Sequence, residues 1–247
     1  HEKFEVIVVN NNPYDIFPEN ILSFKCVFLT EKKVGSYAAR NLGISFSKGE
    51  ILAFTDSDCI PDPCWIKLAV NRFNSDIERL AGNIDVFSMS LNPNIAELYD
   101  MTFGFDQELS AKIGLSVTAN MFARSSLFEK FGKFDSSMFS GGDTEWSRRV
   151  FSKGISIEYA PEVIVKHPAR RSLKELFKKR LRVSGKKTIF YNNPNKNQIS
   201  KFKIYKKRML YLLYGKHSFY IVVSVLCIAI LLKFFSKLVK IFYKIKK

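Results

Sequence analysis

Apolar and polar positions along the first two thirds of the chain follow a pattern typical of short strands joined by short helices. The apolar runs 4–10 and 51–55 predict buried strands, and the stretch 36–47 between them carries helix formers and ends in a basic turn before Gly49. A strand, a helix and a strand with short connections form a βαβ unit. The pattern therefore predicts an α/β domain with a mixed, mostly parallel sheet flanked by helices.

Further strands and helices are predicted as far as residue 168. They are the helices 63–73, 125–131 and 143–153 and the strands 80–87, 155–159 and 163–166. Glycines close two of the helices, at Gly132 and Gly154. Residues 92–118 carry mixed signals and give no assignment.

The chain changes character after residue 171. A capping box, Ser172-Leu173-Lys174-Glu175, predicts the start of a basic helix, and a polar, basic linker is expected after Asn192. The segment Phe219–Leu232 has 14 residues without a charge. Roughly 20 residues are needed to span a bilayer, so spanning would require Lys233 to extend its ammonium group to the membrane surface.

Five lysines at the C-terminus follow one another at intervals of four and three residues, which places them on one helix face. They are Lys233, Lys237, Lys240, Lys244 and Lys247. The spacing predicts a basic amphipathic helix lying on anionic lipid. A core helix with a solvated lysine face is the alternative. Basic residues flank the apolar segment on both sides, so charge does not decide whether it spans.

The net charge of +16 is unevenly distributed. Residues 1–165 carry 16 Lys and Arg against 22 Asp and Glu, whereas residues 166–247 carry 23 against one, Glu175. This asymmetry predicts an acidic partner for the C-terminal part, either anionic lipid or nucleic acid. The sequence has no nucleic-acid-binding motif, and the neighbouring apolar segment favours lipid.

The cysteines at positions 26, 59, 64 and 227 match neither a zinc-site spacing nor a redox pair. A chain of 247 residues can build a core that needs no disulfides. We therefore expect free thiols in a reducing compartment.

Asp56-Ser57-Asp58 follows directly after the predicted strand 51–55. Ligands bind at the carboxyl ends of strands in α/β sheets, and two adjacent carboxylates repel each other unless a cation lies between them. Oxygen ligands of this kind suit Mg²⁺ or Mn²⁺ together with substrate phosphates. The motif thus predicts a metal site for a nucleotide diphosphate, with an Asp-rich turn before a helix as the alternative.

Two further candidates lie later in the chain. Asp143 opens the predicted helix 143–153, where the helix dipole favours its ionised form and makes it available as a base. His167 ends a predicted strand before Pro168 and is a candidate metal ligand. Taken singly, Asp143 could be only an N-cap and His167 only a structural residue.

Together these segments resemble the family 2 glycosyltransferases, which have the GT-A fold of nucleotide-diphospho-sugar transferases. Five segments carry the resemblance, in the family's order, over residues 4–167. They are Phe4–Asn11, Gly35–Ile44, Asp56–Asp58, Phe131–Asp135 and Gly142–Trp146. A lone Asp-x-Asp is weak support, whereas five ordered segments are specific.

The resemblance implies a donor site with a metal ion. Asp56 would contact the nucleoside side of a nucleotide sugar, and Asp58 would bind Mn²⁺ or Mg²⁺ on its diphosphate. His167 would complete the metal shell. Arg40 would lie near the donor, where a guanidinium suits phosphate.

The resemblance also implies the catalytic group. Asp143 would take the proton of the acceptor hydroxyl, with Glu145 and Trp146 beside the acceptor. A single displacement of this kind inverts the anomeric configuration.

The chain departs from the family pattern in three places. Asn10 stands where members commonly have Asp, so an amide would make the contact with the donor base. Gly142 replaces the usual Glu before Asp143. Members also begin with a strand and a helix that precede the first strand here, and we expect both upstream of residue 1.

The sequence thus predicts a GT-A domain at 1–170, a basic helix and linker at 171–217, and a membrane-associated apolar segment with a basic helix at 218–247. The expected function is metal-dependent, inverting sugar transfer from a nucleotide-diphosphate donor, with a UDP-sugar favoured. The expected acceptor is a hydroxyl of a glycan or a lipid-linked acceptor at the cytoplasmic face of the membrane, without nucleic acid. The alternative is a catalytically inactive, membrane-docked binding protein of the same fold.

Overall fold

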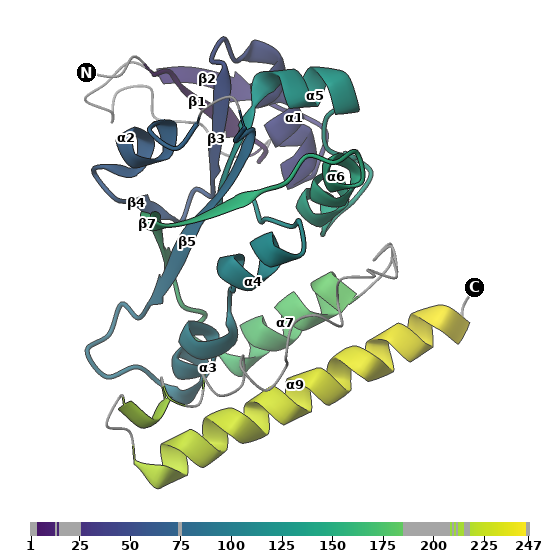
Figure 1. The fold of residues 1–247 in the computed structure, drawn as a ribbon. Helices are drawn as coiled ribbons and strands as arrows, with labels where there is room; N and C mark the ends of the chain where they lie inside the picture. The colour runs from purple at the N-terminus through teal and green to yellow at the C-terminus, as the bar shows by residue number, and fades with distance from the viewer. Residues whose placement is uncertain are drawn as a thin grey trace.

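The fold is described from a computed structural model of residues 4–12, 14, 26–73, 76–184, 208, 210, 212–214 and 218–245 (Figure 1). Its strands are β1 (Val6–Asn10), β2 (Cys26–Thr30), β3 (Ile51–Thr55), β4 (Ile60–Pro61), β5 (Arg79–Phe87), β6 (Asn120–Arg124) and β7 (Glu158–Pro168). Its helices are α1 (Ser36–Phe46), α2 (Trp65–Val70), α3 (Ile95–Phe103), α4 (Gln107–Lys112), α5 (Ser125–Phe131), α6 (Gly142–Phe151), α7 (Leu173–Ser184) and α9 (Phe219–Ile245).

The described strands form two sheets. The larger has the order β3-β6-β5-β7-β4, and the smaller is the parallel pair β1-β2. In the larger sheet β5 and β7 are parallel, and the other three pairings are antiparallel. The fold is the expected α/β arrangement with a mixed sheet, but it has fewer parallel pairings than predicted. After α3 and α4, β6 runs antiparallel to the first part of β5, from Met121 opposite Ala81 to Ala123 opposite Arg79.

Strand β2 changes the predicted βαβ unit. It lies between β1 and α1 in the chain and pairs with β1, from Val6 opposite Cys26 to Asn10 opposite Thr30. Among the described strands β1 has no other partner. Instead, residues 4–9 around β1 and residues 50–58 around β3 both line the large cleft of the domain.

The two short strands predicted at 155–159 and 163–166 are one strand, β7. Its pairing with β5 shifts between Gly82 opposite Ala160 and Asn83 opposite Ile164, so a bulge accommodates Pro161 and its neighbours. A proline cannot donate to the ladder, which is why the sequence suggests a break there.

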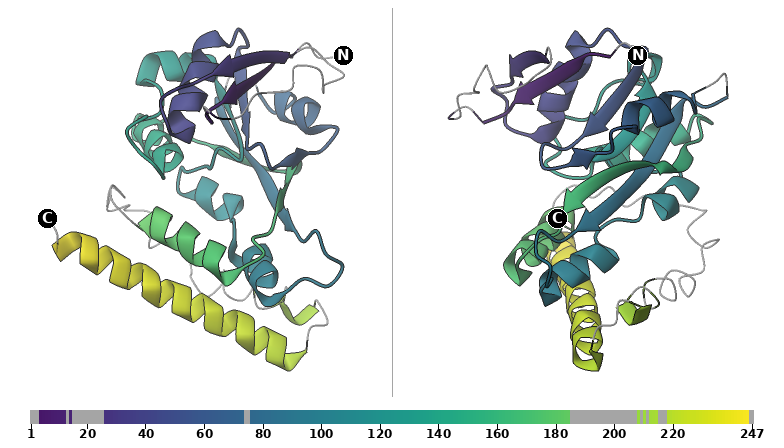
Figure 2. Two further views of the ribbon diagram at one scale, coloured as in Figure 1. Left: turned by 180° about the vertical axis from the view of Figure 1, so that it is seen from behind. Right: turned by 90° about the vertical axis from the view of Figure 1, so that its left-hand side faces the viewer.

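The C-terminal part of the domain consists of α7 and α9 (Figure 2). Helix α7 begins one residue after Ser172, whose Oγ accepts a hydrogen bond from the Glu175 N–H at 3.3 Å, as the capping box predicts. Helix α9 is one continuous helix of 27 residues, not an apolar segment followed by a separate basic helix. The predicted linker falls largely outside the described residues. A window from Phe219 to Phe242 is long and apolar enough to cross a membrane.

A buried asparagine joins three elements of the larger sheet. Asn120, at the start of β6, is fully buried. Its Oδ1 accepts the indole N–H of Trp65 at 2.9 Å, and its Nδ2 donates to the carbonyls of Asn83 at 2.7 Å and Val163 at 2.9 Å. These bonds fix α2, β5 and the bulge of β7 to one another around a side chain that no apolar residue can replace.

We predict that Asn120→Leu lowers the free energy of unfolding by about 3 kcal/mol or more, because it leaves three buried polar groups without partners. Denaturant titration followed by circular dichroism measures the change. The control is Asn71→Ala, at an exposed asparagine after α2, which should stay within about 0.5 kcal/mol of the parent. A loss below about 1 kcal/mol for Asn120→Leu would contradict this account.

Candidate active site

A large cleft of 1730 Å³ opens between the two sheets and α7. The ends of β1, β3 and β7, the start of α6 and one side of α7 contribute to its lining. Five of the residues singled out from the sequence line it, namely Arg40, Asp56, Asp58, Asp143 and His167. These residues come from four separate segments, and the fold brings them to one place.

The pairing of β4 with β7 brings Asp58 to His167. Ile60 lies opposite Lys166 and Pro61 opposite Val165, so the residues just before β4 lie beside the end of β7. The Oδ2 of Asp58 is 3.8 Å from the Nε2 of His167. Asp58 is exposed to the cleft, whereas His167 is buried and packs on the ring of Phe105, with centroids 4.9 Å apart.

The hydrogen bond of His167 fixes its tautomer. Its Nδ1 lies 2.7 Å from the carbonyl oxygen of Pro168, and a carbonyl can only accept, so we assign the proton to Nδ1. A neutral ring then presents the lone pair of Nε2 to the carboxylate of Asp58. Two acceptors that face each other in this way suit a shared cation.

The groups around Asp58 fit a divalent metal ion. Ligand atoms of Asp56, Asp58, Cys59 and His167 all lie within 4.8 Å of one another. Two carboxylates and one imidazole nitrogen form a ligand set that Mn²⁺ binds readily. Mg²⁺ would bind mainly to the carboxylate oxygens of the set. This part of the sequence-based prediction agrees with the chemistry of the site.

Asp56 is held by a cation of the protein itself. The guanidinium of Arg40 lies 2.5 Å from its Oδ1. Arg40 projects from α1 one helical turn after Tyr37 and lies 5.6 Å from the centre of that ring. The Arg40–Asp56 pair thus joins α1 to the end of β3 at the edge of the cleft.

Asp143 lies in the first turn of α6, but it is not the N-cap, since Gly141 has that position. Its Oδ1 accepts the hydroxyl of Tyr37 at 3.1 Å and the N–H of Thr144 at 2.8 Å. Among the described residues, its Oδ2 has only a longer bond, 3.4 Å, from the N–H of Thr118. Burial and then the charge of Asp143 raise the pKa of Tyr37 to about 12, so the phenol remains a donor.

Glu145 and Trp146, expected beside an acceptor, do not line the cleft. Trp146 is fully buried, stacks on Phe128 and donates its indole N–H to the carbonyl of Gly132 at 2.9 Å. Both carboxylate oxygens of Glu145 accept bonds from Arg149, at 2.9 and 3.0 Å. A fully buried indole cannot touch a substrate, so the structure corrects the expected contact for Trp146.

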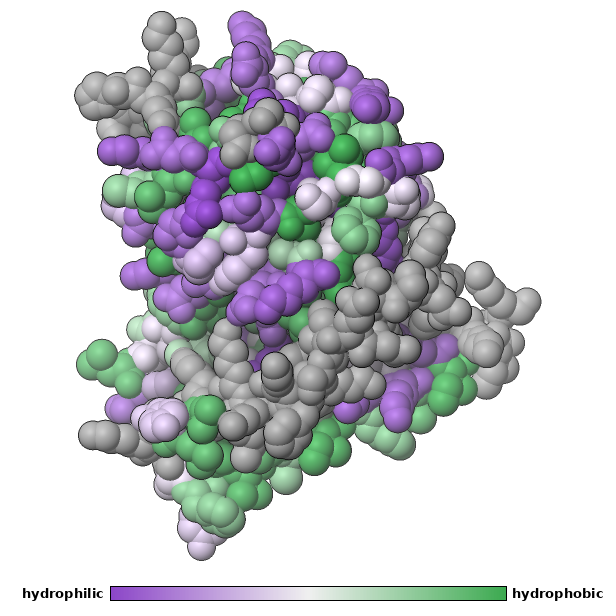
Figure 3. All heavy atoms as spheres, in the orientation of Figure 1, coloured by the Kyte–Doolittle hydropathy of each residue, from purple (hydrophilic) through white to green (hydrophobic). Residues whose placement is uncertain are grey.

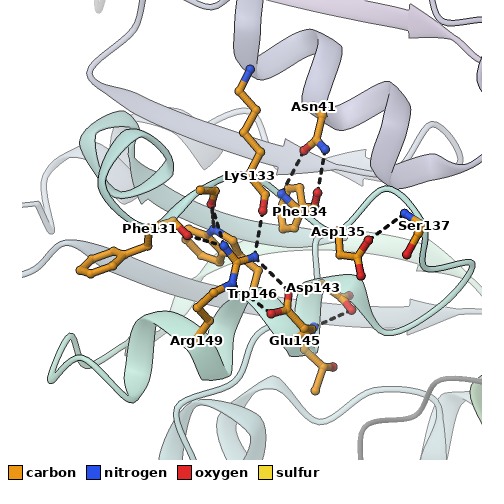
Figure 4. A network of polar contacts seen from close by, with 12 residues as sticks. Asn41, Phe131, Lys133, Phe134, Asp135, Ser137, Asp143, Glu145, Trp146 and Arg149 are labelled. Carbon is orange, nitrogen blue, oxygen red and sulfur yellow. Dashed lines mark hydrogen bonds and ion pairs between the residues drawn. The ribbon is translucent and has the colours of Figure 1, made fainter.

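These two residues instead hold α6 in place (Figure 4). The guanidinium of Arg149, oriented by Glu145, also donates to the carbonyls of Phe131, Gly132 and Lys133. The loop after α5 and the helix that carries Asp143 are therefore joined by one guanidinium and one indole.

Asn10 lies at the end of β1 but outside the lining of the cleft. Its Oδ1 accepts the N–H of Asn12 at 2.8 Å. The lining residue is its neighbour Asn11, whose amide bonds to the carbonyls of Glu31 and Lys33 and to the N–H of Gly35. Sequence reasoning missed Asn11, although the run of three asparagines after a strand was visible.

Helix α7 adds basic residues to the cleft that the sequence did not single out. Lys179 bonds to Asp100 at 3.4 Å and to the carbonyl of Gly104 at 3.2 Å, and its ammonium lies 4.5 Å from the centre of the Phe105 ring. Burial lowers the pKa of Lys179 to about 8. Because Phe105 also packs on His167, one aromatic ring connects α7 to His167.

Comparison with known proteins agrees with this architecture. The family described as Glycosyl transferase family 2 matches residues 1–132. Glycosyltransferase AglE of Haloferax volcanii is 35% identical over 189 residues, which are 73% of this chain and 62% of that protein. The pre-mycofactocin glycosyltransferase of Mycobacterium tuberculosis is 27% identical over 148 residues, which are 57% of this chain and 32% of that protein. The chain therefore spans less than two thirds of either relative.

Among solved structures, the mannosyltransferase PcManGT from Pyrobaculum calidifontis, in complex with GDP-Man and Mn²⁺, is similar with a TM-score of 0.54. The similarity covers 96% of this chain and 62% of that one at 14% sequence identity, so it concerns the fold. With the family match over more than half of its length, the chain belongs to glycosyl transferase family 2 and has the GT-A fold.

Proposed function

We propose that this protein transfers a sugar from a nucleotide-diphosphate donor to a hydroxyl group of a glycan or lipid-linked acceptor, with a divalent metal ion and with inversion at the anomeric carbon. The observation that carries the proposal is the convergence of Asp58, His167 and Asp143 on one cleft. Membership of family 2 supports the reaction class. The GDP-Man and Mn²⁺ bound to PcManGT support a nucleotide sugar and a metal ion as its partners.

The donor end of the cleft contains the ligands for the ion. Asp58 through Oδ2 and His167 through Nε2 would hold Mn²⁺ or Mg²⁺, and Asp56 and Arg40 would contact the donor. A bound ion supplies positive charge for the leaving diphosphate. The role of Asn10 in contacting the donor base stays a prediction. UDP is the favoured nucleotide, and GDP is the alternative.

Asp143 is the proposed base. Because its Oδ1 is occupied by two donors, Oδ2 is the oxygen that can take a proton. As the acceptor oxygen forms its bond to the anomeric carbon, its proton passes to Oδ2 and the bond between that carbon and the diphosphate oxygen breaks. Attack from the face opposite the diphosphate inverts the configuration. Glu145 and Trp146 serve this step by holding α6.

The basic C-terminal half of α9 supports association with anionic lipid. Lys233, Lys237 and Lys240 are exposed on α9, and a lysine near such a surface contributes about 1 kcal/mol. Nucleotide sugars of the cytosol meet lipid-linked acceptors at the cytoplasmic face of a membrane, and we place the protein there.

We predict that UDP or GDP binds to the chain in a Mn²⁺-dependent way, and that Asp58→Asn and His167→Ala each weaken this dependence by about tenfold or more, because each removes an ion ligand. Isothermal titration calorimetry with each nucleotide, with and without Mn²⁺, measures it. Glu129→Gln, an exposed carboxylate on α5, is the matched control and should bind as the parent does. Equal Mn²⁺ dependence in all variants would refute the assignment.

We predict that Asp143→Asn lowers the rate of sugar transfer by about 10²-fold or more, because an amide cannot take the proton. Donor affinity should change less than about threefold, since Asp143 lies apart from the ion ligands. Release of nucleotide from UDP- and GDP-sugars in the presence of a panel of glycan and polyprenyl phosphate acceptors measures the rate. Transfer at the parent rate would show that Asp143 is not the base. Nucleotide binding without any transfer by the parent would favour the binding-protein alternative.

A further inference from the structure

One side of helix α9 packs on the rest of the protein, and the opposite side is apolar and exposed to solvent. Four of its apolar residues are buried, namely Val222, Val225, Leu232 and Val239, and the first three of them pack against α3 and α7. On the opposite side an apolar stripe is exposed, and we define it as Val223, Ile230, Phe234, Leu238 and Ile241. Figure 3 shows apolar residues gathered along this edge of the molecule.

The stripe is too apolar for a surface that faces water alone. An 18-residue window within Phe219–Phe242 has a mean hydropathy of 2.4, and only 17% of that window is buried. Soluble proteins rarely expose continuous apolar patches of this kind unless a partner covers them. Lys233, Lys237 and Lys240 lie along one border of the stripe, since each precedes a stripe residue by one position on the helix.

Length alone would allow α9 to span a membrane. A helix of 27 residues is about 40 Å long at 1.5 Å per residue, and a hydrocarbon core is about 30 Å thick. Packing opposes this. Leu176 and Phe177 of α7 are packed against α9, and the ring of Phe177 is 5.1 Å from that of Phe235.

Spanning would carry α7 into the bilayer with α9. Helix α7 has five Lys and Arg residues, and each side chain of this kind is strongly disfavoured at the centre of a bilayer. A helix that lies flat has no such conflict. Its stripe enters the acyl boundary, its lysines meet the phosphates, and α7 stays above the surface.

We propose that α9, docked on α3 and α7, lies in the surface plane of an anionic membrane without crossing it. The inference refines the lipid association proposed above and does not depend on catalysis. It also orients the cleft, because α7, which packs on α9, lines the cleft with Lys179 and Arg182.

Flotation with vesicles tests the surface. The chain should float with vesicles of phosphatidylcholine and phosphatidylglycerol and less with phosphatidylcholine alone. The double variant Ile230→Asp, Phe234→Asp should lose at least tenfold in binding, and the triple change of Lys233, Lys237 and Lys240 to Gln should remove the preference for phosphatidylglycerol. Phe46→Asp, at an exposed phenylalanine on α1, is the matched control and should bind as the parent does. A chain that ignores vesicles, or pairs with a second copy through the stripe in sedimentation, would overturn the proposal.

Labelling of the two ends of α9 tests the orientation. In a chain whose native cysteines are replaced by serine, Ser218→Cys and Lys240→Cys are made singly, and a membrane-impermeant maleimide is added outside reconstituted vesicles. Both positions should react to the same extent before detergent is added. Reaction at one end and protection at the other would mean that α9 spans. Nucleotide release in detergent is measured in parallel, so that loss of transfer is distinguished from an error in orientation.

A second inference rests on Gly142. A Cβ atom at this position would lie 2.8 to 3.0 Å from the ring atoms Cε2, Cδ2 and Cγ of Tyr37. The φ of Gly142 is not positive, so the constraint is the space taken by the ring. Tyr37 is buried, and its hydroxyl donates to Oδ1 of Asp143 at 3.1 Å.

The geometry points to Tyr37 as a positioning residue for Asp143, with Gly142 as the residue that admits its ring. An acidic side chain before Asp143 would collide with the ring, and the hydroxyl instead orients the carboxylate from α1. The tyrosine thereby occupies Oδ1 of Asp143 and leaves Oδ2 with the longer bond from the N–H of Thr118. This inference rests on the proposed role of Asp143 as the base.

Tyr37→Phe tests the role, because it keeps the ring and removes the donor. The kcat of sugar transfer should fall about tenfold while the donor KM and the melting temperature stay near those of the parent. Gly142→Ala should lower the melting temperature, and the added change Tyr37→Leu should restore most of it. A parental kcat in Tyr37→Phe would overturn the inference.

A measurement that does not require sugar transfer tests the role of Tyr37 independently of the proposed function. Loss of the hydrogen bond from Tyr37 changes the surroundings of the carboxylate, so the ¹³C chemical shift of the labelled Asp143 carboxyl carbon should differ between Tyr37→Phe and the parent. An unchanged chemical shift would also overturn the inference, whether or not the parent transfers sugar.

Discussion

Repulsion between carboxylates in one cleft is the constraint around which this structure is arranged. Asp56, Asp58 and Asp143 approach the same space, and each has a different kind of partner. A guanidinium of α1 holds Asp56, whereas a phenol and two backbone N–H groups hold Asp143. Asp58 faces the lone pair of His167, which offers no proton when the ring is neutral. The position of α1, the start of α6 and the pairing of β4 with β7 bring each carboxylate to its partner.

Much of the fold could be predicted because local pattern and tertiary structure agree. The strand Ile51–Thr55 and the helix Ser125–Phe131 have the predicted bounds. Strand β2 was missed, since a run of five residues gives little periodicity, and its pairing with β1 is a long-range property. Helix α3 was also missed, although Asn94 and Glu97 form a capping box at its start.

The site was predictable where chemistry coincides with the end of an element. Arg40, Asp56, Asp58, Asp143 and His167 line the cleft, as their motifs suggested. Glu145 and Trp146 do not line the cleft, and no pattern in the sequence shows that Trp146 is buried or that Glu145 binds Arg149. Tyr37 stands in a motif noted from the sequence, but its bond to Asp143 joins positions 106 apart, and only the packing of α1 on α6 reveals it.

Helix α7 serves two surfaces at once, since one side lines the cleft and another packs on α9. With α9 on a bilayer, the cleft stands at a fixed height above the lipid phosphates. An acceptor anchored in the same membrane then arrives by lateral diffusion, and its surface density, not its bulk concentration, sets how often it meets the donor. The soluble donor still diffuses through the bulk solution, so its bulk concentration sets how often it reaches the cleft. The rates at which such an enzyme meets its two substrates would thus depend on different quantities. Dilution of the membrane with inert lipid would slow the encounter with the acceptor but not the encounter with the donor.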